Sequence, residues 1–375
     1  MNLRAFALLL PLLPVTLYAC SSDPAVAKDG GTTQPGVDGS LPGENDGSIP
    51  VEPTDGATPP LGDGAVLPDG AADPNPLSGA VVAEHLGSAE TMMMGVGYMD
   101  GLLWADGALF FTDPYADGGK GHIWRLPRVG AEPAQVPISN KAIGLCSDPV
   151  GGTIVITETT PPAITRRKAD GTAREVVAAN ATNNATFNGA NDCVVVQNKG
   201  IYVTDPDYIG QNQAKEAVYR LTGTPAVVTT VLEYDRAMAK HPNGIAVSPD
   251  GNTLYVSLTG ASGPGAGEIV KVTLGADGAP VGPPATFATT GANPDGLATD
   301  TDGNVYVATA AGVEAYSTAG RKWGVLALPG TQKATSLAFG DPMGKTLFVG
   351  SVKDGAIGVG NGVIHKIVMR TAGIP

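Results

Sequence analysis

The sequence predicts an all-β fold, a six-bladed β-propeller, from three observations. One short unit recurs six times, and each copy has an apolar strand, a turn with Asp or Gly, and a second apolar strand. The copies start 40 to 52 residues apart, which is the spacing of propeller blades. Residues 79–375 show no amphipathic helix of useful length. The six copies open at Asp100, Ile143, Asn191, Asn243, Asp295 and Thr335.

Residues 1–19 predict a lipoprotein signal peptide. Arg4 precedes an apolar run that is too short and too interrupted by proline to span a membrane. The run ends in the letters LYAC, which resemble a bacterial lipobox, so Cys20 is the expected lipidation site. An ordinary secretory signal with a coincidental cysteine is the alternative. Because Ser21 follows Cys20, and not Asp, we expect the anchor in the outer membrane of a bacterial cell envelope, on its periplasmic or its surface face.

Residues 20–78 predict a disordered, acidic tether rich in Pro and Gly. From residue 21 onward the segment has no aromatic residue, and ten acidic residues stand against the single basic Lys28. Such a segment buries too little apolar surface to offset its chain entropy, and its like charges repel. Residues 79–375 are mildly acidic and carry no basic patch, which argues against a nucleic-acid partner. They are long enough for one propeller with a continuous core.

Each unit is expected to form the two inner strands of a blade, which one or two further apolar segments complete. The sixth blade lacks an outer strand after Arg370. The apolar segment 80–86 is expected to supply that strand and close the ring, which removes exposed sheet edges. Apolar residues at strand spacing are expected in the blade cores, among them Trp104, Phe110, Trp124 and Tyr306. The third strands are expected at 122–128, 163–169, 217–223, 268–275, 312–318 and 363–370.

Cys146 and Cys193 are the two cysteines of the predicted propeller. They fall on the inner strands of neighbouring blades. A disulfide is possible in an exported protein. Two buried free thiols are the equally weighted alternative, because disulfide geometry is strict.

Four of the six opening positions hold side chains with oxygen ligands, namely Asp100, Asn191, Asn243 and Asp295. Equivalent positions of a propeller surround one axis, so these side chains should converge at one mouth of the central channel. Two carboxylates and two amide oxygens suit Ca²⁺ or another hard cation. The alternative is that the Asn-Gly and Asp-Gly pairs are turn residues. The four histidines are scattered without ligand spacing, so structural zinc is not expected.

Four stretches resemble the signatures of the senescence-marker-protein/gluconolactonase family. They are residues 187–208, 241–257, 293–309 and 335–351, and the resemblance covers about residues 95–370. It implies a six-bladed propeller with a divalent cation in its channel that hydrolyses sugar lactones and other cyclic esters. By this resemblance Asn243 and Asp295 match metal ligands, and Asn191 matches an Asn that contacts metal or substrate. Asp100 stands where the family has a Glu, which is one methylene longer.

Two neighbouring residues are weighed for further roles. Asp192 follows Asn191 and is a possible general base, but strand alternation predicts that its side chain points away from the axis. A role as a hydrogen-bond acceptor at the strand end is therefore favoured for Asp192. Tyr208 lies in a loop after the blade-three hairpin, where it is expected to reach the mouth and bind substrate.

These features together predict a metal-dependent lactonase tethered to the cell envelope. Asp295 is expected to act as metal ligand and catalytic base, with a water acidified by the cation as the alternative base. Ca²⁺ is the favoured cation, and Zn²⁺, Mn²⁺ or Mg²⁺ are alternatives. The expected partners are a small lactone or sugar-derived substrate and a membrane, and the protein is expected to be a monomer. The competing hypothesis is a non-catalytic, surface-displayed binding propeller, since propellers carry many functions.

Overall fold

The computed structural model describes residues 75, 77, 90–136, 140–149, 151–211, 213–260, 267–291, 293–353 and 360–374. The predicted signal peptide, its Cys20 and nearly all of the predicted tether lie outside these residues. Among the described residues, no helix is long and apolar enough to cross a membrane.

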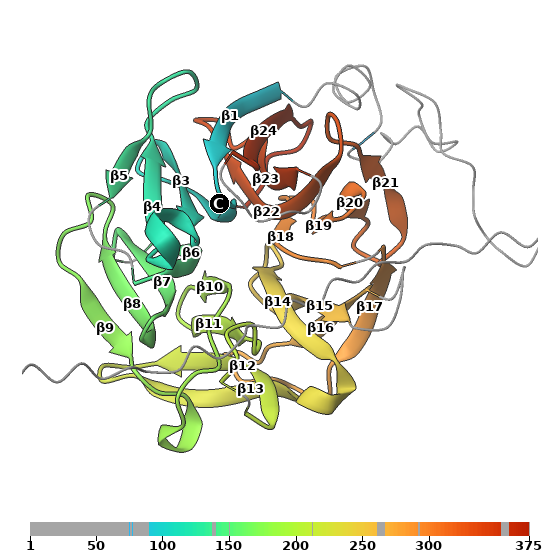
Figure 1. Cartoon of the computed structure of the whole chain (residues 1–375). Coiled ribbons are helices and arrows are strands. Elements are labelled where there is room, and N and C mark those ends of the chain that lie inside the picture. Colours follow the sequence, from blue (N-terminus) through green and yellow to red (C-terminus); the bar gives the residue numbers. More distant parts are fainter. Residues whose placement is uncertain are drawn as a thin grey trace, which may run out of the picture. The chain divides into compact units, whose positions relative to one another are not determined.

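Six four-stranded antiparallel sheets surround one central axis, so the predicted six-bladed propeller is confirmed (Figure 1). In the first five sheets the first strand along the chain lies innermost, next to the axis, and in the sixth sheet the innermost strand is β22 (Gln332–Gly340) (Figure 1). The first blade contains β2 (Asp100–Ala105), β3 (Ala108–Asp113), β4 (His122–Leu126) and β5 (Ala134–Val136). The second contains β6 (Ala142–Asp148), β7 (Thr153–Thr159), β8 (Pro162–Lys168) and β9 (Glu175–Ala178). The third contains β10 (Cys193–Val196), β11 (Gly200–Asp205), β12 (Lys215–Thr222) and β13 (Val227–Asp235).

The other three blades repeat this plan. The fourth contains β14 (Lys240–Val247), β15 (Thr253–Gly260), β16 (Gly267–Thr273) and β17 (Ala285–Thr290). The fifth contains β18 (Leu297–Thr299), β19 (Val305–Thr309), β20 (Gly312–Tyr316) and β21 (Lys322–Leu326). The sixth contains β22 (Gln332–Gly340), β23 (Thr346–Lys353) and β24 (Gly362–Val368). The described helices are single turns, α2 (Ala116–Gly119), η1 (Thr182–Asn184) and η2 (Arg236–Met238).

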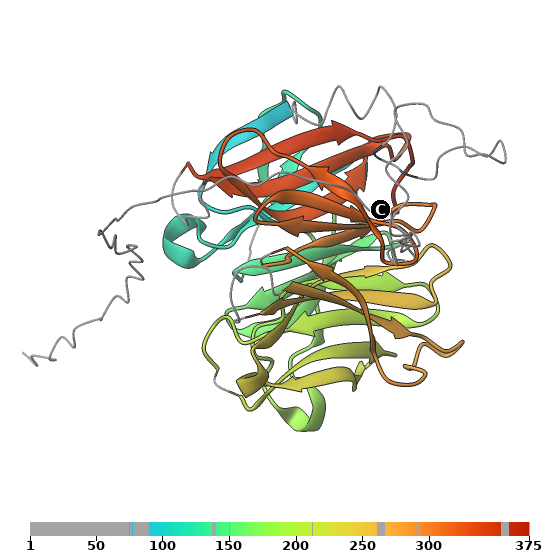
Figure 2. The same cartoon turned by 90° about the vertical axis from the view of Figure 1, so that its right-hand side faces the viewer.

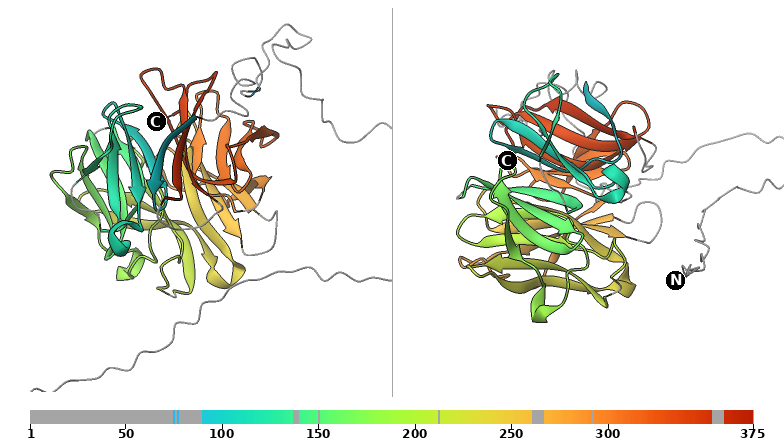
Figure 3. Two further views of the ribbon diagram at one scale, coloured as in Figure 1. Left: turned by 45° about the horizontal axis from the view of Figure 1, so that its top comes forward. Right: turned by 60° about the vertical axis from the view of Figure 1, so that its left-hand side comes forward.

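The fourth strand of the sixth blade is β1 (Glu90–Val96), which pairs antiparallel with β24. Strands from the two ends of the described chain thus share one sheet, and they lie side by side in every view (Figures 1, 2 and 3). The segment 80–86, which we expected at this edge, lies outside the described residues. The strand that takes the edge follows it a few residues later. This pairing covers the outer edge of β24, which would otherwise be open to another chain.

The blade cores contain the apolar residues that strand spacing predicted. Phe110 and Tyr306 are completely buried. Trp104 and Trp124 are partly buried and pack on the core between the first and sixth blades, where Trp104 stacks on Phe348 with ring centroids 5.7 Å apart. Leu77 is also buried, in the core cluster of the fifth and sixth blades, so packed residues reach further toward the N-terminus than position 79.

Cys146 of β6 and Cys193 of β10 form a disulfide, with their Cα atoms 5.7 Å apart. The bond joins the inner strands of the second and third blades. It decides between the two alternatives that the sequence left open.

Candidate active site

The opening residues of the blades are held at one level by hydroxyl groups of the preceding blades. Thr112, Thr157, Thr204 and Ser257 lie on the second strands of the first four blades. Each hydroxyl donates to the backbone carbonyl that opens the next blade, at 2.6 to 2.7 Å. The acceptors are, in order, Ile143, Asn191, Asn243 and Asp295. These four opening positions are therefore structurally equivalent, as the repeat predicted.

The glycines that follow the opening residues serve close packing. A Cβ on Gly244 would lie 2.3 Å from the carbonyl oxygen of Asp295, and a Cβ on Gly144 would lie 2.3 Å from that of Asn191. Asn243 and Gly244 lie inside strand β14 rather than in a turn. The turn alternative therefore fails at Asn243. Glycine is required there because inner strands of neighbouring blades approach within van der Waals distance.

Asp100 and Asp295, from the first and fifth blades, influence each other's charge at the mouth. Burial, and then the charge of Asp295, raise the pKa of Asp100 well above its ordinary value. Burial likewise raises the pKa of Asp295 to about 6, against the opposing charge of Lys333 and a hydrogen bond from the side chain of Asn243. Lys333 Nζ lies 4.0 Å from Asp295 Oδ2. The mouth thus brings two carboxyl groups together in a poorly solvated place, which favours their neutral form while no cation is bound.

The donor atoms at this mouth fit a hard cation. Asn243 is buried, and its Nδ2 donates to Thr259 Oγ1 at 3.1 Å. Its Oδ1 is also buried and has no hydrogen-bond donor. An amide oxygen without a donor beside two carboxylates is a set that Ca²⁺ prefers. Asn191 is buried at the equivalent backbone position. Within the described ranges, no three His, Cys, Asp or Glu residues are grouped to hold a metal.

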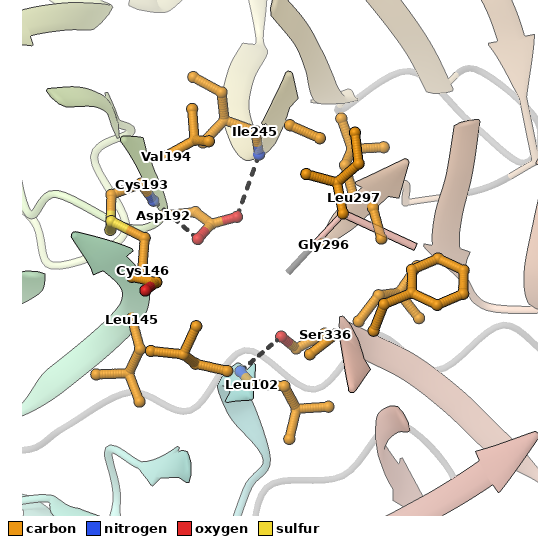
Figure 4. A pocket seen from close by; sticks show the side chains of 18 of the residues that line it. Leu102, Leu145, Cys146, Asp192, Cys193, Val194, Ile245, Gly296, Leu297 and Ser336 are labelled. Carbon is orange, nitrogen blue, oxygen red and sulfur yellow. Dashed lines mark hydrogen bonds between the residues drawn. A yellow bond between two sulfur atoms is a disulfide. The ribbon is translucent and has the colours of Figure 1, made fainter. Parts of the chain in front are cut away.

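Asp192 differs from the prediction, because its side chain points into the channel and not away from it (Figure 4). It lines a central cavity of about 130 Å³. Its Oδ1 accepts from the N–H of Cys193 at 2.8 Å, and its Oδ2 accepts from that of Ile245 at 3.1 Å. The predicted acceptor role is confirmed, and burial raises the pKa of Asp192 to about 7. The direction was wrong because β10 begins only at Cys193, so regular alternation does not yet apply to Asp192.

Ser336 holds the place of Asp192 in the sixth blade. Its Oγ accepts from the N–H of Leu102 at 3.0 Å, which ties the sixth blade to the first (Figure 4). Leu145, Leu297 and other apolar residues line this cavity together with the polar Ser147 and Thr299 (Figure 4). Backbone N–H donors fix Asp192 and Ser336 within it.

Tyrosines frame the mouth, and of these only Tyr208 was expected there from the sequence. Tyr208 is 47% exposed, hydrogen-bonds the side chain of Thr259, and lies 5.8 Å from the ring of His241. Tyr98 and Tyr115 meet edge to face at 5.6 Å. Burial and the charges of Asp295 and Asp100 raise the pKa of Tyr98 well above 10. In the sequence, Tyr98 stands two residues before Asp100, and this closeness could have predicted its place at the mouth.

A buried carboxylate orients His241 beside this mouth. His241 Nδ1 lies 2.7 Å from Glu216 Oε2, and Glu216 is 1% exposed. His241 precedes Asn243 by two residues on β14. Nothing in the sequence pairs it with Glu216, because β12 and β14 belong to different blades.

Fold and site together define a six-bladed propeller with an oxygen-lined, acidic channel mouth. Residues 99–353 match the family described as SMP-30/Gluconolactonase/LRE-like region, and the chain belongs to this family.

Individual relatives are more distant. A curated gluconolactonase of Zymomonas mobilis subsp. mobilis is 28% identical over 184 residues, which are 44% of this chain and 48% of that protein. The match therefore spans about half the length of this curated relative. A solved gluconolactonase of Xanthomonas campestris has 24% identity and a TM-score of 0.63, over 84% of this chain and 99% of that one. The calcium-binding protein regucalcin of Agrobacterium tumefaciens has 17% identity and a TM-score of 0.60, over 76% and 95%. These solved structures share the fold.

Proposed function

We propose that the protein is a divalent-cation-dependent hydrolase of lactones. Membership of the gluconolactonase family supports the reaction class. The observation that carries the cation is the buried Asn243 Oδ1, which has no donor and stands by the mouth carboxylates of Asp295 and Asp100.

Asp100, Asn191, Asn243 and Asp295 would hold the cation. When bound, it would supply Lewis-acid polarisation of the ester carbonyl. Ca²⁺ is our first choice because all four donors are oxygen, with Zn²⁺, Mn²⁺ and Mg²⁺ to be tested beside it. The calcium-binding neighbour of the same fold agrees with this choice.

The protein's own residues would position the lactone and take its proton. Asp295 is the proposed base that accepts a proton from the attacking water. Tyr208 offers a half-exposed ring face on which a lactone ring can pack, and Tyr98 and Tyr115 continue this aromatic wall. The ring of Tyr208 is in tilted contact with the ring of His241, and this contact restricts the orientations that the Tyr208 ring can take.

We also propose that the propeller is lipid-anchored through Cys20 to the cell envelope, on the basis of the lipobox-like letters before it. The acidic composition of residues 21–78 supports a tether between the anchor and the propeller.

The test is hydrolysis of a panel of sugar and aliphatic lactones by the purified protein. Each assay is run after chelation and after addition of Ca²⁺, Zn²⁺, Mn²⁺ or Mg²⁺. We expect turnover of at least one lactone that chelator removes and a cation restores. Absence of hydrolysis under every condition would reject the proposal and favour the binding propeller. Cation-independent turnover would retain the hydrolase and reject its metal dependence.

A further inference from the structure

Lys333 is a basic side chain at the proposed cation site. It lies on β22, the inner strand of the sixth blade, two residues before the opening position Thr335. Its Nζ is 4.0 Å from Asp295 Oδ2, and its side chain is 28% exposed. Among the described residues, no other basic side chain comes within 4.0 Å of Asp295 or Asp100.

The ammonium of Lys333 lies near Asp295 but is farther from it than in a close ion pair. Lys322 lies 2.7 Å from Glu314, and Lys240 lies 3.0 Å from Glu268, which are ordinary ion-pair distances. At 4.0 Å, Lys333 contributes its charge but leaves the oxygens of Asp295 accessible to another partner. A divalent cation bound by those oxygens would be repelled by the ammonium, because the mouth is poorly solvated and screens charge weakly.

We propose that Lys333 is a built-in counter-ion of the cation site. It neutralises Asp295 while no divalent cation is bound, and it lowers the affinity of the site for that cation. This inference rests on the proposed function, because it takes Asp295 and Asp100 as cation ligands. The Lys333 side chain would thereby set the free cation concentration at which the site becomes occupied.

Calorimetric titration with CaCl₂ of the chelator-treated, desalted protein tests the inference. We expect Lys333→Met to bind Ca²⁺ at least about tenfold more tightly than wild type, because a nearby positive charge has been removed. Lys333→Gln should bind Ca²⁺ as tightly as Lys333→Met does. It serves as the second variant if Lys333→Met folds poorly. Lys333→Arg keeps the charge and should stay within about twofold of wild type. Lys271→Met is the matched control, because it removes the same charge from the exposed face of β16 and should change nothing.

Thermal unfolding without cation gives a second readout. Lys333→Met should melt below wild type in chelator, because the buried carboxylate of Asp295 then lacks a counter-charge, and Ca²⁺ should raise its melting temperature more than that of wild type. Equal Ca²⁺ affinity of Lys333→Met, Lys333→Gln and wild type, with binding still lost in Asp295→Ala, would overturn the inference and leave the proposed function standing. If neither wild type nor the Lys333 variants bind any cation, the inference and the metal dependence both fail.

Discussion

The hydroxyl of Ser257 donates a hydrogen bond of 2.7 Å to the backbone carbonyl of Asp295, which opens the next blade. The hydroxyl oxygen of Ser257 also accepts a hydrogen bond of 2.8 Å from the N–H of Gly244, within its own blade. Thr157 and Thr204 make the corresponding pair of bonds in the second and third blades. In the second, third and fourth blades, one buried hydroxyl thus fixes the backbone of the candidate ligand in the following blade.

Replacing that hydroxyl should loosen the candidate site. Ser257→Ala leaves a buried N–H of Gly244 and the carbonyl of Asp295 without partners, so we expect the free energy of unfolding to fall by about 1–3 kcal/mol. Ca²⁺ affinity should fall as well. Ser257→Thr is the control, since other blades carry Thr here, and it should stay close to wild type. Denaturant unfolding and calorimetry measure both effects, and an unchanged Ser257→Ala would contradict them.

Removing Asp295 should abolish cation binding and lactonase activity while the fold survives. Asp295→Ala deletes one of two anionic ligands at the mouth, outside the blade cores that carry most of the stability. Asp100→Glu is the companion variant, since it restores the family's longer side chain and should maintain or raise Ca²⁺ affinity. Calorimetric titration of the three proteins decides. Equal affinity in wild type and Asp295→Ala would remove the metal site.

Stability should decrease as pH rises toward neutrality. Burial raises the pKa of Asp205 to about 7 from an ordinary 3.8, although its oxygens accept from the N–H groups of Asn188 and Gly189 at 2.9 Å. The folded protein therefore holds this proton more tightly than the unfolded chain does. The free energy of unfolding should then fall between about pH 4 and about pH 7.

Burial raises the pKa of Asp192 to about 7 and acts in the same direction. Denaturant unfolding of the chelated protein across this range measures the slope, and Asp205→Asn should reduce it because the residue no longer titrates. A stability that is constant or rises over this range would contradict the prediction.

The disulfide should stabilise the propeller by constraining the unfolded chain. Cys146 and Cys193 are 47 residues apart, so the double variant Cys146→Ser, Cys193→Ser should lose about 2–4 kcal/mol of unfolding free energy. Urea denaturation with and without reductant measures this. Reductant should weaken wild type and leave the double variant unaffected, and a wild type that is insensitive to reductant, though its bond is reduced, would argue against the role.

Membrane attachment should depend on Cys20. Cys20→Ala should release the protein to the soluble fraction or block its processing, because the acyl-carrying thiol is absent. Fractionation followed by immunoblotting measures the distribution, and Ser21→Ala serves as the neighbouring control. Unchanged membrane association of Cys20→Ala would reject the lipoprotein prediction.

The sequence by itself determined the number of blades, the place of each inner strand to within about three residues, and the candidate ligand positions. These follow from local patterns, since strand alternation and turn residues are read within a single unit and the repeat carries the same register around the ring. Asp100, Asn191, Asn243 and Asp295 could be selected in this way, because one rotation relates equivalent positions.

Only the tertiary structure decided the contacts between blades. The disulfide, the approach of Lys333 to Asp295, and the pairing of His241 with Glu216 bring together residues that no local pattern connects. The side chain of Asp192, which precedes β10, points into the channel, where it accepts a hydrogen bond from the N–H of Ile245 in the next blade. The physical reason is that charge and burial at the mouth depend on how closely neighbouring inner strands approach, and this distance is a property of the closed ring.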